Sequence, residues 1–215
     1  MLEGTTSMKL AVLFSGGKDS CLALHKVLEQ GHEVSCLLNI NPQNFDSFMF
    51  HKPYLNVLRR QAEELGIELI IEGSEGEKEE ELGDLRRLIE KVKNEVEGIV
   101  VGGIASSYQG TRVKKICEEL DLEFVAPILD YSPDKVWKEL LEAGFETILS
   151  KIACDGLSRD WIGKVISKES FQEFKKLPPP ITGIAFEVDT RDAEEGFSKA
   201  FVQKIEISPK KTMKR

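Results

Sequence analysis

The chain has 215 residues, of which 41% are hydrophobic and 31% are charged, and its formal net charge is −8. This size and composition are typical of one α/β domain with a small appendage, large enough to fold without disulfides or structural metals. No apolar run reaches the roughly 20 residues of a membrane-spanning helix. The negative charge disfavours proteins that follow a nucleic-acid backbone through a basic face.

The cysteines indicate a reducing compartment. The chain has four, widely spaced and without a C-x-x-C pair: Cys21, Cys36, Cys117 and Cys154. This spacing argues against a zinc site, a disulfide framework and a persulfide relay. We therefore expect a cytoplasmic protein whose cysteines are inert, and residues 1–8, which carry no signal-peptide pattern, are expected to be a terminal extension.

Apolar runs and amphipathic stretches alternate along the chain, which predicts an α/β fold with a doubly wound, mostly parallel sheet. The predicted strands are 10–14, 34–40, 67–71, 99–101, 124–125 and 145–153. The predicted helices are one ending near 29, then 53–65, 75–97, 107–120, 132–143, 158–166 and 168–176. The pattern changes after residue 155, so we expect a larger domain over 9–155 and a smaller subregion over 156–215.

The first strand runs directly into the glycine-rich sequence Ser15-Gly16-Gly17-Lys18-Asp19-Ser20, and a helix begins there. Glycines let the backbone approach an anion, and the N–H groups of a helix start bind phosphate. Lys18 adds a positive charge, Ser15 and Ser20 add hydroxyl groups, and Asp19 is a reasonable ligand for Mg²⁺ carried by phosphates. The spacing excludes a Walker A motif and the dinucleotide-binding G-x-G-x-x-G motif.

Two further polar clusters follow predicted strands, and the carboxyl ends of strands in such a sheet meet in one crevice. The first cluster contains His51, for which an ordinary loop histidine is the alternative. The second begins at Gly102, and a capping role is the alternative for Ser106 or Ser107. The side chains that we expect to face a substrate there, with Gly102, are Ser106, Tyr108, Gln109 and Arg112.

The glycine-rich loop Ser15–Ser20 resembles the PP-loop of ATP pyrophosphatases, which cleave ATP between its α- and β-phosphates. Together with later motifs, the chain resembles one branch of that superfamily, the diphthine–ammonia ligases, over residues 9–165. The matching positions are Ser15–Ser20, Ser47-x-Met49-x-His51, Val101-Gly102-Gly103-Ile104, Ser107-Tyr108-Gln109-x-x-Arg112-Val113, Cys117, Leu120, Pro127, Gly156-Leu157 and Trp161-x-Gly163.

The chain departs from this family near its C-terminal end. Members usually carry the motif Gly-Glu-Gly-Gly-Glu-(Phe or Tyr)-Glu-Thr, and the nearest stretch here is Thr182–Thr190. In that stretch Gly183, Phe186 and Glu187 correspond, but the leading acidic residues are missing. This departure concerns the acceptor substrate and leaves the ATP loop unaffected.

The resemblance implies an ATP- and Mg²⁺-dependent ligase that adenylates the diphthine carboxylate of elongation factor 2 and aminates it with free ammonium. It implies phosphate binding by Ser15–Ser20 and adenine contact near Leu38–Ile40, with Lys18, Asp19 and His51 as catalytic residues and Asp19 as the metal ligand. Two alternatives stay open: a tRNA-modifying PP-loop enzyme, such as a thiolase or lysidine synthetase, and an ATP-binding sensor without turnover. The sequence does not give the oligomeric state, and a homodimer is compatible with it.

Overall fold

A computed structural model describes residues 6–42, 55–75, 80–102, 107–148, 158–174 and 176 of the chain. The chain divides into two compact units, residues 1–131 and 132–215. This division falls before the helix predicted from residue 132. The predicted change at residue 155 lies in a stretch that is not described, so the proposed domain limits of 9–155 and 156–215 stay a prediction.

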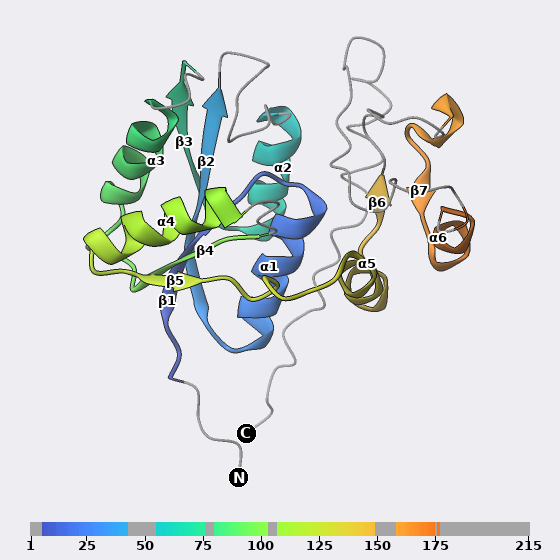
Figure 1. The fold of residues 1–215 in the computed structure, drawn as a ribbon, viewed down its shortest axis with the longest axis horizontal. Coiled ribbons are helices and arrows are strands. Elements are labelled where there is room, and N and C mark those ends of the chain that lie inside the picture. The colour runs from blue at the N-terminus through green and yellow to red at the C-terminus, as the bar shows by residue number, and fades with distance from the viewer. Residues whose placement is uncertain are drawn as a thin grey trace. The chain divides into compact units, whose positions relative to one another are not determined.

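The first unit is built on a five-stranded sheet in which every strand pair is parallel. Its strand order is β3-β2-β1-β4-β5, which places β1 at the centre (Figure 1). The strands are β1 (Lys9–Leu13), β2 (Glu33–Pro42), β3 (Glu68–Ser74), β4 (Gly98–Val100) and β5 (Glu123–Val125). The predicted doubly wound parallel sheet is confirmed.

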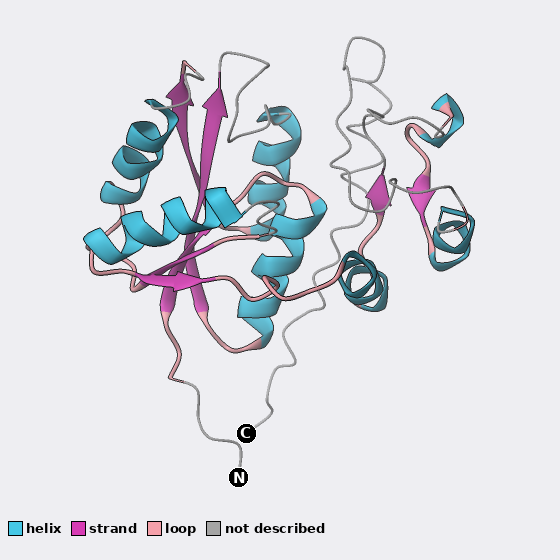
Figure 2. Cartoon of the chain, viewed as in Figure 1, coloured by secondary structure: helices cyan, strands magenta, loops and turns pink. Residues whose placement is uncertain are grey.

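Helices cover both faces of this sheet (Figure 2). In Figure 1, α1 (Lys18–Glu29) and α2 (Leu55–Leu65) lie on one face, and α3 (Glu80–Glu90) and α4 (Ser107–Glu119) lie on the other. The winding direction reverses between β1 and β4, and this switch point is where open α/β sheets bind their ligands.

The hydrophobic core follows from strand alternation, because successive side chains of a strand point to opposite faces. In β1, Ala11 packs in a cluster with Leu85, Leu88 and Ile89 of α3 and with Ile116 of α4. Its neighbours along β1, at positions 10 and 12, are also fully buried and point to the opposite face. Burial on both faces explains the near-continuous apolar run of the first strand.

The second unit contains α5 (Pro133–Glu142), β6 (Thr147–Ile148), β7 (Val165–Ile166) and α6 (Lys168–Phe174). Ser132 caps α5 as predicted, because its side chain accepts a hydrogen bond from the Lys135 N–H. The Trp137 ring of α5 packs on Phe171 of α6 with ring centroids 5.3 Å apart. The two short strands pair antiparallel and form a separate sheet.

Two of the predicted helices are corrected by the structure. A helix over 158–166 is wrong: a 3-10 turn, Arg159–Trp161, is followed by Gly163 at φ +75° and then by β7. A backbone with positive φ cannot continue a right-handed helix. The helix predicted to run to residue 97 ends at Glu90 in the structure, where its described residues are Glu80–Glu90, and the buried residues Val92 and Val96 lie beyond its end.

Several helices end in the same hydrogen-bonded turn, which puts one residue in the left-handed conformation. At the end of α1, Gly31 has φ +86° and the His32 N–H donates to the Val27 carbonyl. At the end of α4, Asp121 takes the equivalent position with φ +55°, and the Leu122 N–H donates to the Cys117 carbonyl. Among the residues that the structure describes, Asp121 is the one non-glycine with positive φ.

Replacing this aspartate with glycine is expected to stabilise the protein. Asp121→Gly should raise the free energy of unfolding by roughly 0.5–1 kcal/mol, because glycine reaches the left-handed region without steric cost. The reciprocal change, Gly31→Ala, should lower the free energy of unfolding by about 1 kcal/mol. Urea unfolding followed by circular dichroism measures both. A loss of stability in Asp121→Gly would show that the aspartate side chain contributes more than its backbone costs.

Candidate nucleotide-binding site

The glycine-rich loop joins the carboxyl end of β1 to the first residue of α1. Gly16 has φ +72°, a conformation that L side chains rarely adopt. Gly17 is the N-cap of α1, and it offers no side chain to accept hydrogen bonds from the first turn. The N–H groups of that turn therefore keep their partial positive charge for a ligand, which is the arrangement that binds phosphate at helix starts.

The two loop serines hold the turn in shape. The Ser15 and Ser20 hydroxyl oxygens lie 3.2 Å apart, and the Ser20 hydroxyl donates to the Gly17 carbonyl at 3.0 Å. The Gly17 N–H reaches the Ser15 hydroxyl at only 3.4 Å, near the outer limit for a hydrogen bond. Ser20 is 5% exposed, and its hydroxyl contacts groups of the loop itself.

The two charged residues of the loop form an ion pair with each other. The Lys18 Nζ lies 2.6 Å from Asp19 Oδ2, and both side chains are about one-third exposed, at 30% and 35%. A Mg²⁺ ion that arrives with nucleotide phosphates needs only one or two protein carboxylates. No cluster of three or more His, Cys, Asp or Glu exists in the described part of the chain. Asp19 therefore fits a phosphate-borne Mg²⁺ better than an all-protein metal cage.

Gly102, just beyond β4, approaches the loop closely. A Cβ atom on Gly102 would lie 2.8 Å from the Ser20 nitrogen and 2.9 Å from the Asp19 carbonyl carbon, both of them backbone atoms. Only glycine allows the end of β4 to pack so tightly on the first turn of α1. The structure therefore brings Gly102, expected on the substrate side, against the nucleotide loop.

The remaining predicted site residues are described in part. His51 and Ser106 lie outside the described residues, as does the altered stretch 182–190. Tyr108 and Gln109 belong to the first turn of α4, and their side chains are not described. Arg112 lies on α4, where it is half-buried and interacts with neighbouring groups.

The structure adds two amide residues to the loop that were not predicted from the sequence. The Asn39 Nδ2 donates to the Phe14 carbonyl at 2.8 Å, and the Gln61 Nε2 donates to the Gly16 carbonyl at 3.2 Å. Asn39 is 5% exposed and Gln61 is 3% exposed. The sequence pattern could have revealed Gln61. It lies on the same face of α2 as the buried Leu58 and Ala62, where a polar residue is unexpected.

The stretch expected to meet the adenine lies at the end of β2. The Leu38 carbonyl accepts the Phe14 N–H at 2.8 Å, so this group is used in the sheet. β2 continues to Pro42, beyond its last pair with β1 at Leu38. The backbone after Leu38 is therefore the part that β1 leaves unpaired.

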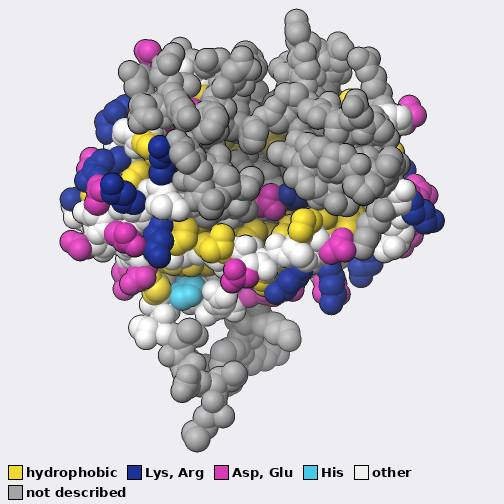
Figure 3. Space-filling model, in the orientation of Figure 1, with side chains coloured by type: hydrophobic (Ala, Val, Ile, Leu, Met, Phe, Trp, Pro, Cys, Tyr) yellow, Lys and Arg dark blue, Asp and Glu magenta, His cyan; other side chains and the backbone are white. Residues whose placement is uncertain are grey.

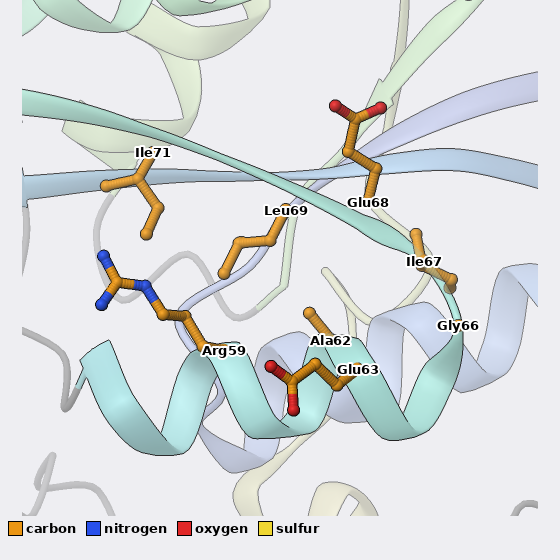
Figure 4. A pocket seen from close by; sticks show the side chains of 8 residues that line it. All are labelled: Arg59, Ala62, Glu63, Gly66, Ile67, Glu68, Leu69 and Ile71. Carbon is orange, nitrogen blue, oxygen red and sulfur yellow. The ribbon is translucent and has the colours of Figure 1, made fainter.

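A shallow groove of about 300 Å³ lies elsewhere on this unit, between α2 and the edge strand β3 (Figure 4). The sheet order separates it from β1 by β2. Figure 4 shows Glu68 and Leu69 leaving β3 on opposite sides, and the Arg59 guanidinium beside Ile71. Its charged groups do not converge on one point, so the loop and not this groove is the candidate site.

The face drawn in Figure 3 carries mixed charge. Among the described residues on that face, Lys and Arg side chains are interleaved with Asp and Glu side chains. This arrangement lacks the one-sign stripe that nucleic-acid-binding surfaces show. No helix in the described ranges combines the length and apolar character needed to cross a bilayer.

The central parallel strand, the glycine-rich loop and the open helix start define a nucleotide-binding α/β protein of the PP-loop type. The family model for the diphthamide synthase N-terminal domain matches residues 8–124. The chain belongs to this family, and its curated relatives are named as ligases.

Diphthine–ammonia ligase of Rattus norvegicus is 30% identical in a match covering 75% of this chain and 68% of that protein. The human protein of that name gives the same figures. The Schizosaccharomyces pombe protein is 32% identical, but the match covers only 30% of its length. Among solved structures, a predicted subunit of tRNA methyltransferase from Methanocaldococcus jannaschii aligns with a TM-score of 0.46 at 15% identity, covering 69% of this chain and 82% of that chain.

Adding one methyl group at the β4 end is expected to disturb the loop. Gly102→Ala should lower the free energy of unfolding by about 1–3 kcal/mol, because backbone atoms of Asp19 and Ser20 must move. Gly73→Ala is the matched control, since no atom lies within 4 Å of its added Cβ. Thermal denaturation measures both variants. Equal stability of the two would contradict the close approach at Gly102.

The described cysteines are expected to be unreactive. Burial of the thiol and the negative charge of Asp19 raise the pKa of Cys21 to about 12, and burial raises the pKa of Cys36 and of Cys117 to about 11. At pH 8 about one Cys21 in ten thousand is then the thiolate, which is the reactive form. Iodoacetamide labelling of Cys21, followed by peptide mass spectrometry, should accelerate with pH without levelling off below pH 11.

The same peptide from urea-unfolded protein is the control for this labelling. In the unfolded protein the labelling rate of Cys21 should level off as the pH rises past the ordinary thiol pKa of about 8.5. A plateau near that pH in the folded protein would contradict the raised pKa and restore Cys21 as a candidate nucleophile.

Proposed function

We propose that this chain is an ATP-dependent diphthine–ammonia ligase. In this proposal it adenylates the diphthine carboxylate of elongation factor 2 and aminates it with ammonium, giving diphthamide, AMP and pyrophosphate. The observation that carries the proposal is the similarity to proteins named diphthine–ammonia ligase over 75% of the chain, within a family match that includes the glycine-rich loop.

The loop would bind the β- and γ-phosphates of the substrate ATP. The uncapped N–H groups at the start of α1 and the Gly17 N–H supply donors fixed in position before the reaction. Such preorganised donors stabilise charge that develops on a leaving pyrophosphate. Lys18 would move from Asp19 to the phosphates, and the carboxylate of Asp19 would then hold Mg²⁺. When bound, Mg²⁺ would supply further positive charge to the phosphate oxygens.

The chemistry has two displacement steps. A carboxylate oxygen of diphthine attacks the α-phosphorus of ATP, the bond from that phosphorus to the bridging oxygen breaks, and pyrophosphate leaves with the electron pair. Ammonia then attacks the acyl carbon, AMP leaves as the carbon–oxygen bond breaks, and the nitrogen loses a proton. We place the acceptor near Gly102 and α4, so that Arg112 would face the reacting groups, together with His51, Ser106, Tyr108 and Gln109.

The described thiols and surface support this proposal over a tRNA thiolase. The pKa values of Cys21, Cys36 and Cys117 are all raised, which does not suit a sulfur carrier. Unpaired cysteines are also usual in reducing compartments, so we propose a cytoplasmic reaction. Residues 156–215 are proposed to lie on the acceptor side.

The direct test combines the purified chain with ATP, Mg²⁺, ammonium and elongation factor 2 bearing diphthine. AMP and pyrophosphate should be released in equal amounts, and mass spectrometry should show the modified histidine converted from acid to amide. Lys18→Ala and Asp19→Ala should each lower the rate of AMP release by about 100-fold, as expected for the loss of one group that stabilises developing charge.

Matched exposed residues control for the loss of charge. Lys115→Ala and Asp130→Ala remove the same charges from exposed positions away from the loop and should leave the rate unchanged. Full activity of both loop variants would reject the assignment of the loop. ATP that binds but is never cleaved in the presence of this substrate would instead favour the sensor, and tight, salt-sensitive tRNA binding would favour the RNA-modifying enzyme.

A further inference from the structure

We infer that the side-chain amides of Asn39 and Gln61 are positioning residues that orient the peptide groups of the nucleotide loop. The inference deepens the proposed function, because it rests on the loop being the ATP site. It concerns two residues outside the glycine-rich motif, one on β2 and one on α2. Both act on carbonyl groups of the loop and neither is proposed to touch the nucleotide.

The first peptide group lies where β1 stops pairing. The last β1–β2 pair is Leu13 with Leu38, so the next carbonyl, that of Phe14, leaves the regular ladder. The Asn39 Nδ2 donates to it at 2.8 Å. A trans peptide is planar with its C=O and N–H antiparallel, so fixing the Phe14 carbonyl toward β2 turns the Ser15 N–H away from β2. The strand order puts β4 on that other side.

The second peptide group is at the centre of the glycine turn. The Gln61 Nε2 donates to the Gly16 carbonyl at 3.2 Å, and the Cys21 thiol, a weak donor, approaches the same oxygen at 3.5 Å. By the same antiparallel geometry, the following N–H, that of Gly17, is turned away from α2. Among the described residues that N–H has the long contact of 3.4 Å to the Ser15 hydroxyl, and it remains suited to donate to a stronger acceptor.

Gly16 and Gln61 fit each other. A Cβ atom on Gly16 would lie 2.3 Å from the Gln61 Oε1, so the absence of a side chain makes room for the amide. Because the Gly16 carbonyl can only accept, the amide nitrogen must face it, and the orientation of the Gln61 amide is fixed by this contact.

The amide oxygens show that stability alone does not explain these residues. Asn39 Oδ1 and Gln61 Oε1 are buried, and neither has a hydrogen-bond partner among the described residues. A buried acceptor without a partner lowers stability, whereas an apolar side chain of the same shape avoids this cost. Two such residues, each donating to a carbonyl of the same loop, are better explained by the orientation that they give the loop.

The test separates nucleotide affinity from stability. Gln61→Met keeps the volume and removes the unpartnered oxygen, which favours folding, but it also leaves the Gly16 carbonyl without its amide donor, which disfavours folding. These two effects oppose each other, so the melting temperature should change little. Its dissociation constant for ATP with Mg²⁺, measured by calorimetry on the full chain, should increase about tenfold, the value of one neutral hydrogen bond. Asn39→Leu should behave in the same way. Gln172→Met and Asn56→Leu make the same exchanges at exposed positions and should change neither quantity.

A second variant gives a readout that a merely structural role would not move. In Gln61→Glu a neutral carboxyl can still donate to the Gly16 carbonyl, but the carboxylate cannot. Burial raises the pKa of such a carboxyl, so ATP affinity should fall as pH rises through that raised pKa. The wild type and Gln61→Met are the controls. Their ATP affinities, measured over the same pH range, show how much of the pH dependence comes from the titration of ATP itself.

The outcomes separate this inference from the proposed function. Wild-type protein that binds no ATP would overturn the nucleotide site, and the inference with it. Wild-type protein that binds ATP, with Gln61→Met and Asn39→Leu binding it equally well, would overturn only the role of the amides. Weaker binding in proportion to a lower melting temperature would likewise overturn it in favour of a structural role. Weaker binding at unchanged stability, with a pH-dependent Gln61→Glu, supports it.

Discussion

The candidate site depends on one close packing contact, between the end of β4 and the start of α1. Gly102 lies directly against the backbone of Asp19 and Ser20, and a single added methyl group would overlap with it. This contact fixes the first turn of α1 relative to the sheet. The backbone of the first turn of α1 therefore borders the switch point between β1 and β4. The loop can present its N–H groups there without a capping side chain.

The loop carries one positive and one negative side chain, and these balance each other. Lys18 and Asp19 are adjacent in sequence and paired in space, so neither charge is left to the solvent alone. A partly exposed pair of this kind contributes little to stability and is easily exchanged for other partners. In the proposed complex, phosphate oxygens would replace Asp19 beside Lys18, and Mg²⁺ would replace Lys18 beside Asp19, so that each side chain would keep a partner of opposite charge.

The sequence predicted the parallel sheet, the loop and the starts of most helices, because these depend on local patterns of apolar residues, glycines and caps. It failed where tertiary structure decides between similar patterns. Val92 and Val96 continue the apolar stripe of α3 but lie beyond its end, and Gly163 interrupts a stretch with helical composition. Gln61 was missed because its partner, the Gly16 carbonyl, is 45 residues away along the chain and becomes a neighbour only in the folded unit.

The central place of β1 also determines when the site can exist during synthesis. β1 pairs with β2 nearby in sequence, but its other neighbour is β4, where Leu10 lies opposite Gly98. Closing such a long loop of chain is entropically costly and comes late in folding. A ribosome-bound chain can thus form the β1–α1–β2 segment early, but the loop can pack against Gly102 only after synthesis has passed residue 102.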